Sequence, residues 1–212
     1  MNKSGALNGI RVIDLSTSVS GAWCARMLAD FGADVALFEG PDGHPARHLA
    51  PFDDAGVSVI AEYVLTNRRS AIVDIEQPSG LDAMRLAAGR ADVLVCSMLP
   101  GDMKSLGLDF TSLRGANPKL IVCSITPHGS TGARSEHPGN DLTTAALSGW
   151  ASINGLADRP PLKPGGLQAS YCAGTMAYGS IVSALLARRK QDPMPGQFID
   201  ISELEVMAST FA

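Results

Sequence analysis

The feature that most constrains the fold of this chain is an alternation of short apolar segments with segments of helical spacing. Residues 10–15 (IRVIDL) are apolar and rich in β-branched side chains, which favours a strand. Residues 21–31 then show apolar side chains at helical spacing, and Gly32 is placed to end that helix. Residues 34–38 (DVALF) form a second apolar segment. The chain therefore begins with a predicted strand–helix–strand unit.

The same alternation continues along the chain. Further strands are predicted at residues 71–75, 92–96, 120–125 and 198–202, and further helices at residues 79–89, 110–116, 141–153 and 171–188. Ser79 is the expected N-cap of the first of these helices. Parallel strands need crossover connections, and these usually contain helices. The sequence therefore predicts an α/β fold with an open, doubly wound, mostly parallel sheet and helices on both faces.

The length and composition predict one domain. The 212 residues, with 45% hydrophobic and 18% charged side chains, are enough for one sizeable core. Residues 7–202 are predicted to form this domain, and residues 203–212 to begin a helix that leads to parts that are absent or supplied by a partner. Residues 39–54 are polar and without periodicity, so we expect a loop over the functional site there.

Charge and cysteine content argue against several classes of protein. The net charge is −4 without any block of like charge, so nucleic acid is not an expected partner. No apolar run approaches the ~18 residues of a membrane span, and the first residues lack the apolar core of a secretory signal. We therefore expect a cytoplasmic protein without a membrane partner. The four cysteines are far apart, which favours reduced thiols and no metal site.

Five segments are informative in combination. They read LNGIRVIDLSTSVSGAWCARMLADFGADVALFEGP from residue 7, NRRS at 67–70, LGLDFTSLRGANPKLIVCSIT at 106–126, GND with a later SG within 139–149, and PGQFIDIS at 195–202. In this order they resemble the N-terminal part of the family III CoA-transferases (CaiB/BaiF type), which include formyl-CoA transferase, carnitine CoA-transferase and α-methylacyl-CoA racemase. The resemblance implies acyl-CoA thioester substrates, no metal, and interlocked, ring-like dimers of longer chains.

The resemblance also implies a nucleophilic aspartate that this chain lacks. The family places it in a segment like PLKxGxxxGDxxxG, whereas residues 161–174 read PLKPGGLQASYCAG, with Ser170 in its place. In the family the carboxylate attacks the thioester, forms a mixed anhydride and then passes CoA on through an enzyme thioester. Ser170 has no histidine or GxSxG motif nearby. It is either a replaced nucleophile or the N-cap of the 171–188 helix.

Other catalytic groups of the resembled family are also incomplete. The racemases place a histidine immediately before the position of Asp141, and this chain has Asn140 there. We interpret Asp141 as a helix-capping residue. All four histidines are expected to be solvated: His44, His48, His128 and His137.

The CoA site is predicted to be partly retained. Arg68 and Arg69 stand where the family has a basic pair near the CoA phosphates, and guanidinium groups suit phosphate oxygens. Ser20 and Gly21 in the first strand–helix turn, and Ser97 after the 92–96 strand, are the other predicted CoA contacts. The first turn lacks GxGxxG, so a nicotinamide cofactor is not expected.

Three functions remain open from the sequence. The chain is a component of a CoA-transferase-like enzyme whose aspartate comes from a partner chain or second module; or an acyl-CoA isomerase, lyase or hydrolase that uses other residues; or a non-catalytic structural subunit. The first is favoured because the fold-defining segments remain while the nucleophile and several CoA contacts differ, at Leu37, residues 97–100 and Ser105. Fold resemblance alone does not decide among them.

Overall fold

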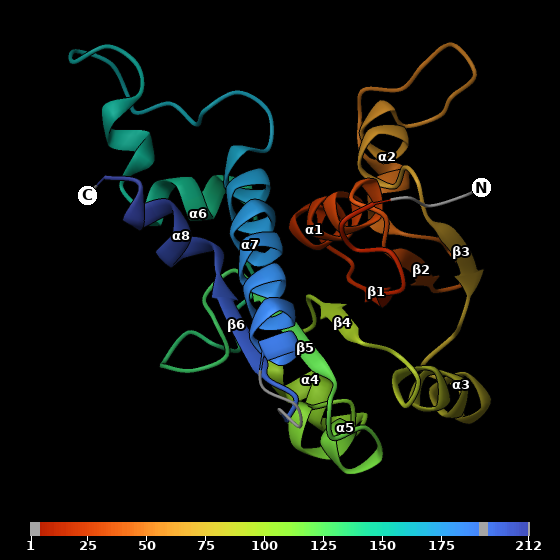
Figure 1. Ribbon diagram of the computed structural model, residues 1–212. Helices are drawn as coiled ribbons and strands as arrows, with labels where there is room; N and C mark the ends of the chain where they lie inside the picture. The colour runs from red at the N-terminus through yellow and green to blue at the C-terminus, as the bar shows by residue number, and fades with distance from the viewer. Residues whose placement is uncertain (1–4, 191–194, 212) are drawn as a thin grey trace.

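The short apolar segments pair as one parallel sheet in the computed structural model, which describes residues 5–190 and 195–211 (Figure 1). The strands are β1 (Arg11–Leu15), β2 (Asp34–Glu39), β3 (Arg69–Ile72), β4 (Val93–Cys96), β5 (Ile121–Thr126) and β6 (Phe198–Ser202). Their order across the sheet is β3-β2-β1-β4-β5-β6, and every neighbouring pair is parallel. The predicted doubly wound α/β fold is confirmed.

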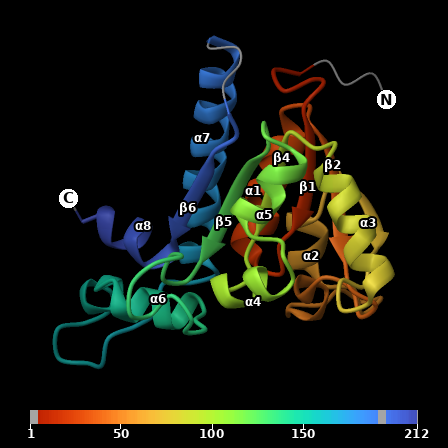
Figure 2. The same cartoon turned by 90° about the horizontal axis from the view of Figure 1, so that it is seen from below.

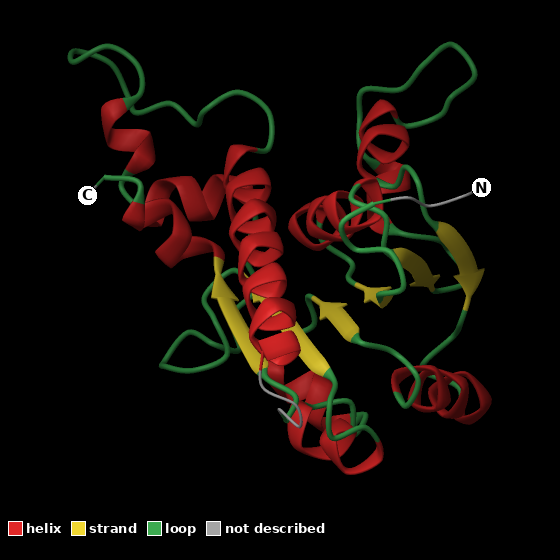
Figure 3. Cartoon of the chain, viewed as in Figure 1, coloured by secondary structure: helices red, strands yellow, loops and turns green. Residues whose placement is uncertain are grey.

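Helices cover both faces of this sheet (Figure 3). They are α1 (Val19–Asp30), α2 (Val59–Val64), α3 (Pro78–Ala88), α4 (Pro100–Ser105), α5 (Phe110–Ala116), α6 (Asp141–Leu147), α7 (Gln168–Lys190) and α8 (Glu203–Ser209), with 3-10 helices η1 (Pro45–His48) and η2 (Trp150–Ile153). Figure 2 shows α6 and α8 beyond the β6 edge of the sheet. None of the helices in the described part of the chain is both long and apolar enough to cross a membrane.

Alternate side chains of the strands divide the core into two layers. Val12 of β1 and Val95 of β4 pack with α1 and α7 on one face. Ile13 and Leu94, one position along the same strands, pack with α3, α4 and α5 on the other. Strands buried on both faces read as continuous apolar runs, which is why they could be recognised in the sequence.

Helix α7 lies close against α1 because Gly174 leaves room between them. A Cβ atom at Gly174 would lie 2.4 Å from the backbone oxygen of Ser20. This close approach fixes the first turn of α7, which contains Ser170, against the first turn of α1. Both turns lie near the carboxyl ends of the central strands.

Some predicted boundaries are wrong, among them those of β3, α3 and α6. Strand β3 begins at Arg69 rather than at residue 71, because its exposed position at the sheet edge does not require apolar side chains. Helix α3 begins at Pro78 with Gln77 as its N-cap, so Ser79 is inside the helix. The predicted 141–153 helix is divided into α6 and η2, because Gly149 between them adopts a φ of 91°.

Candidate functional site

The strand order reverses between β1 and β4, which makes this the switch point of the sheet. In open α/β sheets, ligands bind in the crevice beyond the carboxyl ends of the strands at such a point. Thr17 follows β1 and Ser97 follows β4, and the Thr17 backbone N–H donates to Ser97 Oγ at 2.8 Å. The structure therefore places the predicted site residue Ser97 at the switch point.

Two cavities of about 430 Å³ each lie on either side of this contact, and both are lined by Thr17 and Pro45. The β2-side cavity is walled by Leu15, Phe38, residues 39–45, residues 73–76 and Met98. The β5-side cavity is walled by Ser97, Asn140, Asp141, Ser170 and Glu203, among others. The polar stretch after β2 contributes to both walls, as expected for a loop over the site.

Ser170 lines the β5-side cavity but is not a helix cap. Helix α7 begins at Gln168, so Ser170 lies within its first turn, and the N-cap interpretation is wrong. Ser170 is 7% exposed, and its backbone N–H donates to Oδ1 of Asp141 at 3.0 Å. The Asp141 carboxylate therefore satisfies an N–H group in the first turn of α7, which a helix cannot satisfy internally.

Asp141 is not the cap of its own helix, so its predicted role is wrong. Asn140 is the N-cap of α6 and forms a capping box with Thr143, whereas Asp141 is the first helical residue. Its carboxylate is buried, and Lys163 Nζ donates to Oδ2 at 3.0 Å. Asp141 thus joins α6, the segment before α7 and the Ser170 backbone, and its charge is compensated by Lys163.

Glu203, which the sequence interpretation did not single out, is a second buried carboxyl group in the β5-side cavity. It is the first residue of α8 and is 4% exposed. Burial raises its pKa above the ordinary value, the negative charge of Asp141 raises it further, and the hydroxyls of Ser20 and Thr144 lower it. It forms no ion pair with any residue in the described ranges. The available signal was its position directly after a strand that the sequence predicts, at residues 198–202.

The predicted contacts Ser20 and Gly21 are buried inside the first turn of α1 and line neither cavity. Ser18 caps this helix, and its Oγ accepts the Gly21 N–H at 3.1 Å. A Cβ atom at Gly21 would lie 2.2 Å from Cβ of Ser16, so the turn has room only for glycine. The residues of this turn that face the cavities are instead Thr17 and Ser18, with Val19.

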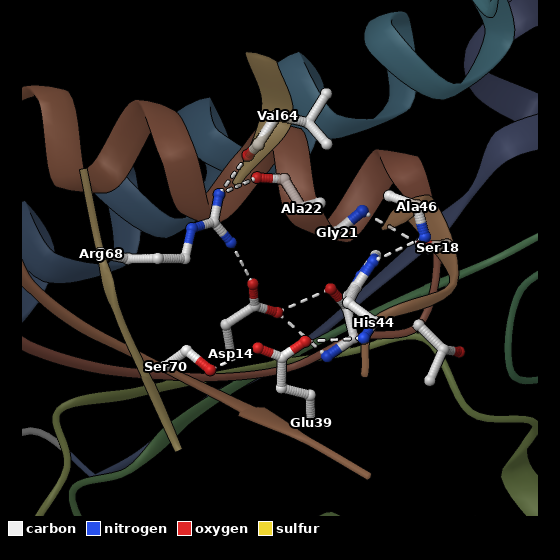
Figure 4. Close-up of polar contacts among 12 residues, drawn as sticks. Asp14, Ser18, Gly21, Ala22, Glu39, His44, Ala46, Val64, Arg68 and Ser70 are labelled. Carbon is white, nitrogen blue, oxygen red and sulfur yellow. Dashed lines mark hydrogen bonds and ion pairs between the residues drawn. The ribbon is translucent and has the colours of Figure 1, made fainter. Parts of the chain in front are cut away.

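Arg68 is enclosed in the protein interior (Figure 4). Its side chain is 1% exposed, and it forms an ion pair with Asp14, whose side chain is 0% exposed. The guanidinium also donates to the backbone oxygens of Ala22 at 2.6 Å and Val64 at 2.5 Å. Arg68 therefore holds α1 and α2 against β1, and this buried position does not support the prediction that it contacts CoA.

Arg69 lies at the end of the strands opposite to the cavities. It is the first residue of β3, and its guanidinium donates to both carboxylate oxygens of Asp34, the first residue of β2, at 2.9 and 2.8 Å. In a parallel sheet all strands begin at the same end. The Arg69–Asp34 pair therefore lies at the amino-terminal ends of the strands, whereas both cavities lie at their carboxyl-terminal ends. The expectation that Arg69 contacts CoA phosphates is therefore not supported either.

Glu39 lines the β2-side cavity. Figure 4 shows its carboxylate next to His44 and Ser70. Arg47 donates to its two oxygens, from Nε at 2.8 Å and from Nη2 at 2.7 Å, and the His44 backbone N–H donates at 2.6 Å. Ser70 Oγ donates to the same carboxylate. These contacts, above all the hydrogen bond from Arg47, lower the Glu39 pKa to about 2 although burial opposes them. Glu39 is therefore ionised and its charge is compensated.

The prediction that all histidines are solvated is wrong for His44, which is 1% exposed. Its Nδ1 accepts the Ala46 N–H at 3.0 Å and caps η1, and burial lowers its pKa. His48 and His137 are exposed, and His128 is intermediate. Among residues 5–190 and 195–211 no group of three or more His, Cys, Asp or Glu side chains could hold a metal ion.

Comparison with known proteins agrees with this architecture. The model of CoA-transferase family III matches residues 7–212. A succinate–glutarate CoA-transferase of Agrobacterium fabrum is 36% identical over 218 residues, which cover 100% of this chain and 54% of the relative. A subunit, BbsE, of the succinyl-CoA:(R)-benzylsuccinate CoA-transferase of Thauera aromatica is 35% identical and is matched over 93% of this chain and 48% of the relative.

A crystal structure of a CaiB/BaiF family protein from Brucella suis superposes with a TM-score of 0.92 at 32% identity, over 98% of this chain and 56% of that one. The chain spans about half the length of the curated relatives it matches. The order of the fold-defining segments, the sheet topology and the nearly complete match to the family model lead to one conclusion: the chain belongs to CoA-transferase family III.

Proposed function

We propose that this chain is a component of a CoA-transferase that acts on acyl-CoA thioesters, and that a partner chain or second module supplies the nucleophilic carboxylate. The observation that carries the proposal is the hydroxyl of Ser170, in the β5-side cavity at the position where the family has its aspartate. CoA transfer between acids needs a carboxylate, because the acyl group passes through an anhydride and then an enzyme thioester. A serine ester is a poor source of a CoA thioester, since hydrolysis competes.

The neighbouring carboxylate does not replace the aspartate. Both oxygens of Asp141 are engaged, Oδ1 by the Ser170 backbone N–H at 3.0 Å and Oδ2 by Lys163 Nζ at 3.0 Å. A carboxylate that is buried, paired with a lysine and needed to hold a helix terminus is a weak nucleophile. The chain therefore keeps the framework of the site while its own nucleophile is missing.

The subunit composition of relatives supports an assembly of two CoA-transferase-like chains. The β and α subunits of the succinyl-CoA–L-malate CoA-transferase of Chloroflexus aurantiacus are 32% and 29% identical to this chain. We propose an interlocked homo- or hetero-oligomer in which such a chain lies against this one. The cytoplasmic location and the division into residues 7–202 and 203–212 stay predictions.

The test is recovery of the tagged chain from its native host, followed by an assay of CoA transfer from succinyl-CoA to a free dicarboxylic acid. The recovered assembly is expected to transfer CoA, and the chain alone is not. Within the assembly, Ser170→Ala should leave the rate unchanged. Full transferase activity of the chain alone would contradict the proposal.

A second candidate function is an acyl-CoA hydrolase, isomerase or lyase that uses other residues of this chain. Glu203 favours it, because this buried carboxyl group lines the same cavity as Ser170 and has no cation partner in the described part of the chain. Release of CoA from succinyl-CoA by the chain alone, lost in Glu203→Gln and kept in the exposed control Glu205→Gln, would favour this function. If neither the chain alone nor the assembly is active, the remaining possibility is a non-catalytic structural subunit.

A further inference from the structure

The β2-side cavity is lined by carboxylates. Glu39 ends β2, Asp42 lies in the loop that follows it, and Asp74 and Glu76 follow β3. The four side chains come from two neighbouring segments at the carboxyl-terminal ends of the strands. No lysine or arginine lines this cavity in the described part of the chain.

Only one of these charges is compensated. Arg47 pairs with Glu39, and neither Asp42, Asp74 nor Glu76 forms an ion pair with a described residue. His44, which also lines the cavity, supplies no compensating charge near neutral pH, because burial lowers its pKa. The cavity therefore carries about three uncompensated negative charges.

The position of the cavity is one where a phosphate group would be expected in a fold of this type. It lies beside the turn between β1 and α1, at the switch point of the sheet, where nucleotides bind in open α/β folds. The first turn of a helix attracts anions with a partial charge of only about +0.5. Three full negative charges at the same opening outweigh that attraction.

The two arginines that could have compensated these three negative charges lie outside the β2-side cavity. Arg68 is buried against Asp14, and Arg69 is paired with Asp34 at the amino-terminal ends of the strands. We propose that the β2-side cavity of this chain excludes the phosphate-bearing nucleotide of CoA, with Asp42 and Glu76 as the specificity-determining residues. This inference rests on the proposed function, and it adds that the partner holds the CoA.

Asp42 and Glu76 are suitable for a direct test because both are exposed. Their hydrogen bonds to His48 and Asp74 use the backbone oxygen of Asp42 and the backbone N–H of Glu76, not the carboxylates. The experiment is calorimetric titration of the isolated chain with CoA and with pantetheine, which lacks the nucleotide, at low and high salt. The variants are the double substitution Asp42→Asn with Glu76→Lys, and the control Glu205→Lys, an exposed acid on α8 outside the cavity.

The wild-type chain is expected to bind CoA no more tightly than pantetheine. The double variant should gain about tenfold or more in affinity for CoA alone, and lose the gain at high salt because screening weakens exposed charges. Glu205→Lys should gain nothing. Tighter binding of CoA than of pantetheine by the wild type, or no gain in the double variant, would overturn the inference.

These outcomes are separate from those of the proposed function. If no partner is recovered, the titrations still decide whether the cavity excludes CoA. If the wild-type chain binds CoA through its phosphates, this inference fails, whereas a partner could still supply the catalytic carboxylate.

Discussion

The Arg68 guanidinium and the Asp14 carboxylate form a buried ion pair beneath the turn that connects β1 to α1. The other oxygen of Asp14, Oδ1, accepts the Ser16 backbone N–H at 3.0 Å and its hydroxyl at 2.6 Å. The pair thus connects the start of β3 to the turn whose next residues, Thr17 and Ser18, line the β5-side cavity. Arg68 acts on the site by positioning this turn.

Arg68→Met is therefore expected to lower the free energy of unfolding by about 3–5 kcal/mol, because it leaves Asp14 charged and unpaired in the interior. Adding Asp14→Asn should restore part of that loss. Urea denaturation of the single and double variants measures both effects. A loss below about 1 kcal/mol in the single variant, with weaker CoA binding, would instead identify Arg68 as a ligand.

Glu39→Gln should reduce stability in a pH-dependent way. The folded-state pKa of Glu39 is lowered from 4.5 to about 2, so its contribution is present above pH 4.5 and is lost as the pH falls toward 2. The expected loss at neutral pH is about 2 kcal/mol, less than the full pKa shift implies because the Arg47 side chain is 44% exposed. Unfolding curves of both proteins across this range should converge at acid pH. A constant difference would contradict the assignment.

Glu203→Gln should change the free energy of unfolding in the opposite direction to Glu39→Gln. Burial raises the folded-state pKa of Glu203 above 4.5, so the folded protein holds this proton more tightly than the unfolded chain. The stability of the wild type therefore falls as the pH rises from 4.5 through the folded-state pKa. The glutamine variant avoids this penalty and should be the more stable protein at neutral pH, with the difference disappearing below the ordinary pKa. Lower stability of the variant at neutral pH would show that ionised Glu203 is held by its neighbours.

Gly174→Ala should separate α7 from α1. The new methyl group would lie 2.4 Å from the Ser20 backbone oxygen, and forcing such an overlap costs about 1–3 kcal/mol. Gly115→Ala is the control, because this glycine lies within α5 with no atom within 4 Å of the added carbon. The control should gain about 0.5–1 kcal/mol of stability from reduced backbone entropy. Thermal unfolding that shows no loss for Gly174→Ala would contradict the close packing.

The sheet could be predicted from the sequence because its central strands are buried on both faces and read as continuous apolar runs. The start of α7 could not, because Ser170 has the side chain of a typical N-cap although the helix begins two residues earlier, at Gln168. The burial of His44 depends on its contacts with Glu39 and Ala46, which a polar sequence segment does not reveal.

The roles of the two arginines show a further limit of sequence reasoning. Arg68 and Arg69 are adjacent, yet one is in the interior and the other at the amino-terminal ends of the strands, because a strand begins between them. From two adjacent arginines in a sequence, one cannot predict which of the two side chains pairs with a buried acidic residue. Glu203 was missed for a similar reason, since its burial follows from the packing of α8 beside α6 and α7.

The proposed assembly has its catalytic carboxylate in a partner chain or second module. The most direct test of this arrangement is borohydride reduction of the native assembly during turnover of succinyl-CoA, which converts the carboxyl group of an enzyme thioester to an alcohol. Peptide mass spectrometry then identifies the residue that was reduced. We predict a reduced aspartate outside residues 1–212, with the peptide that contains Ser170 unmodified. A reduced carboxyl group or an acylated Ser170 in this chain would contradict the account.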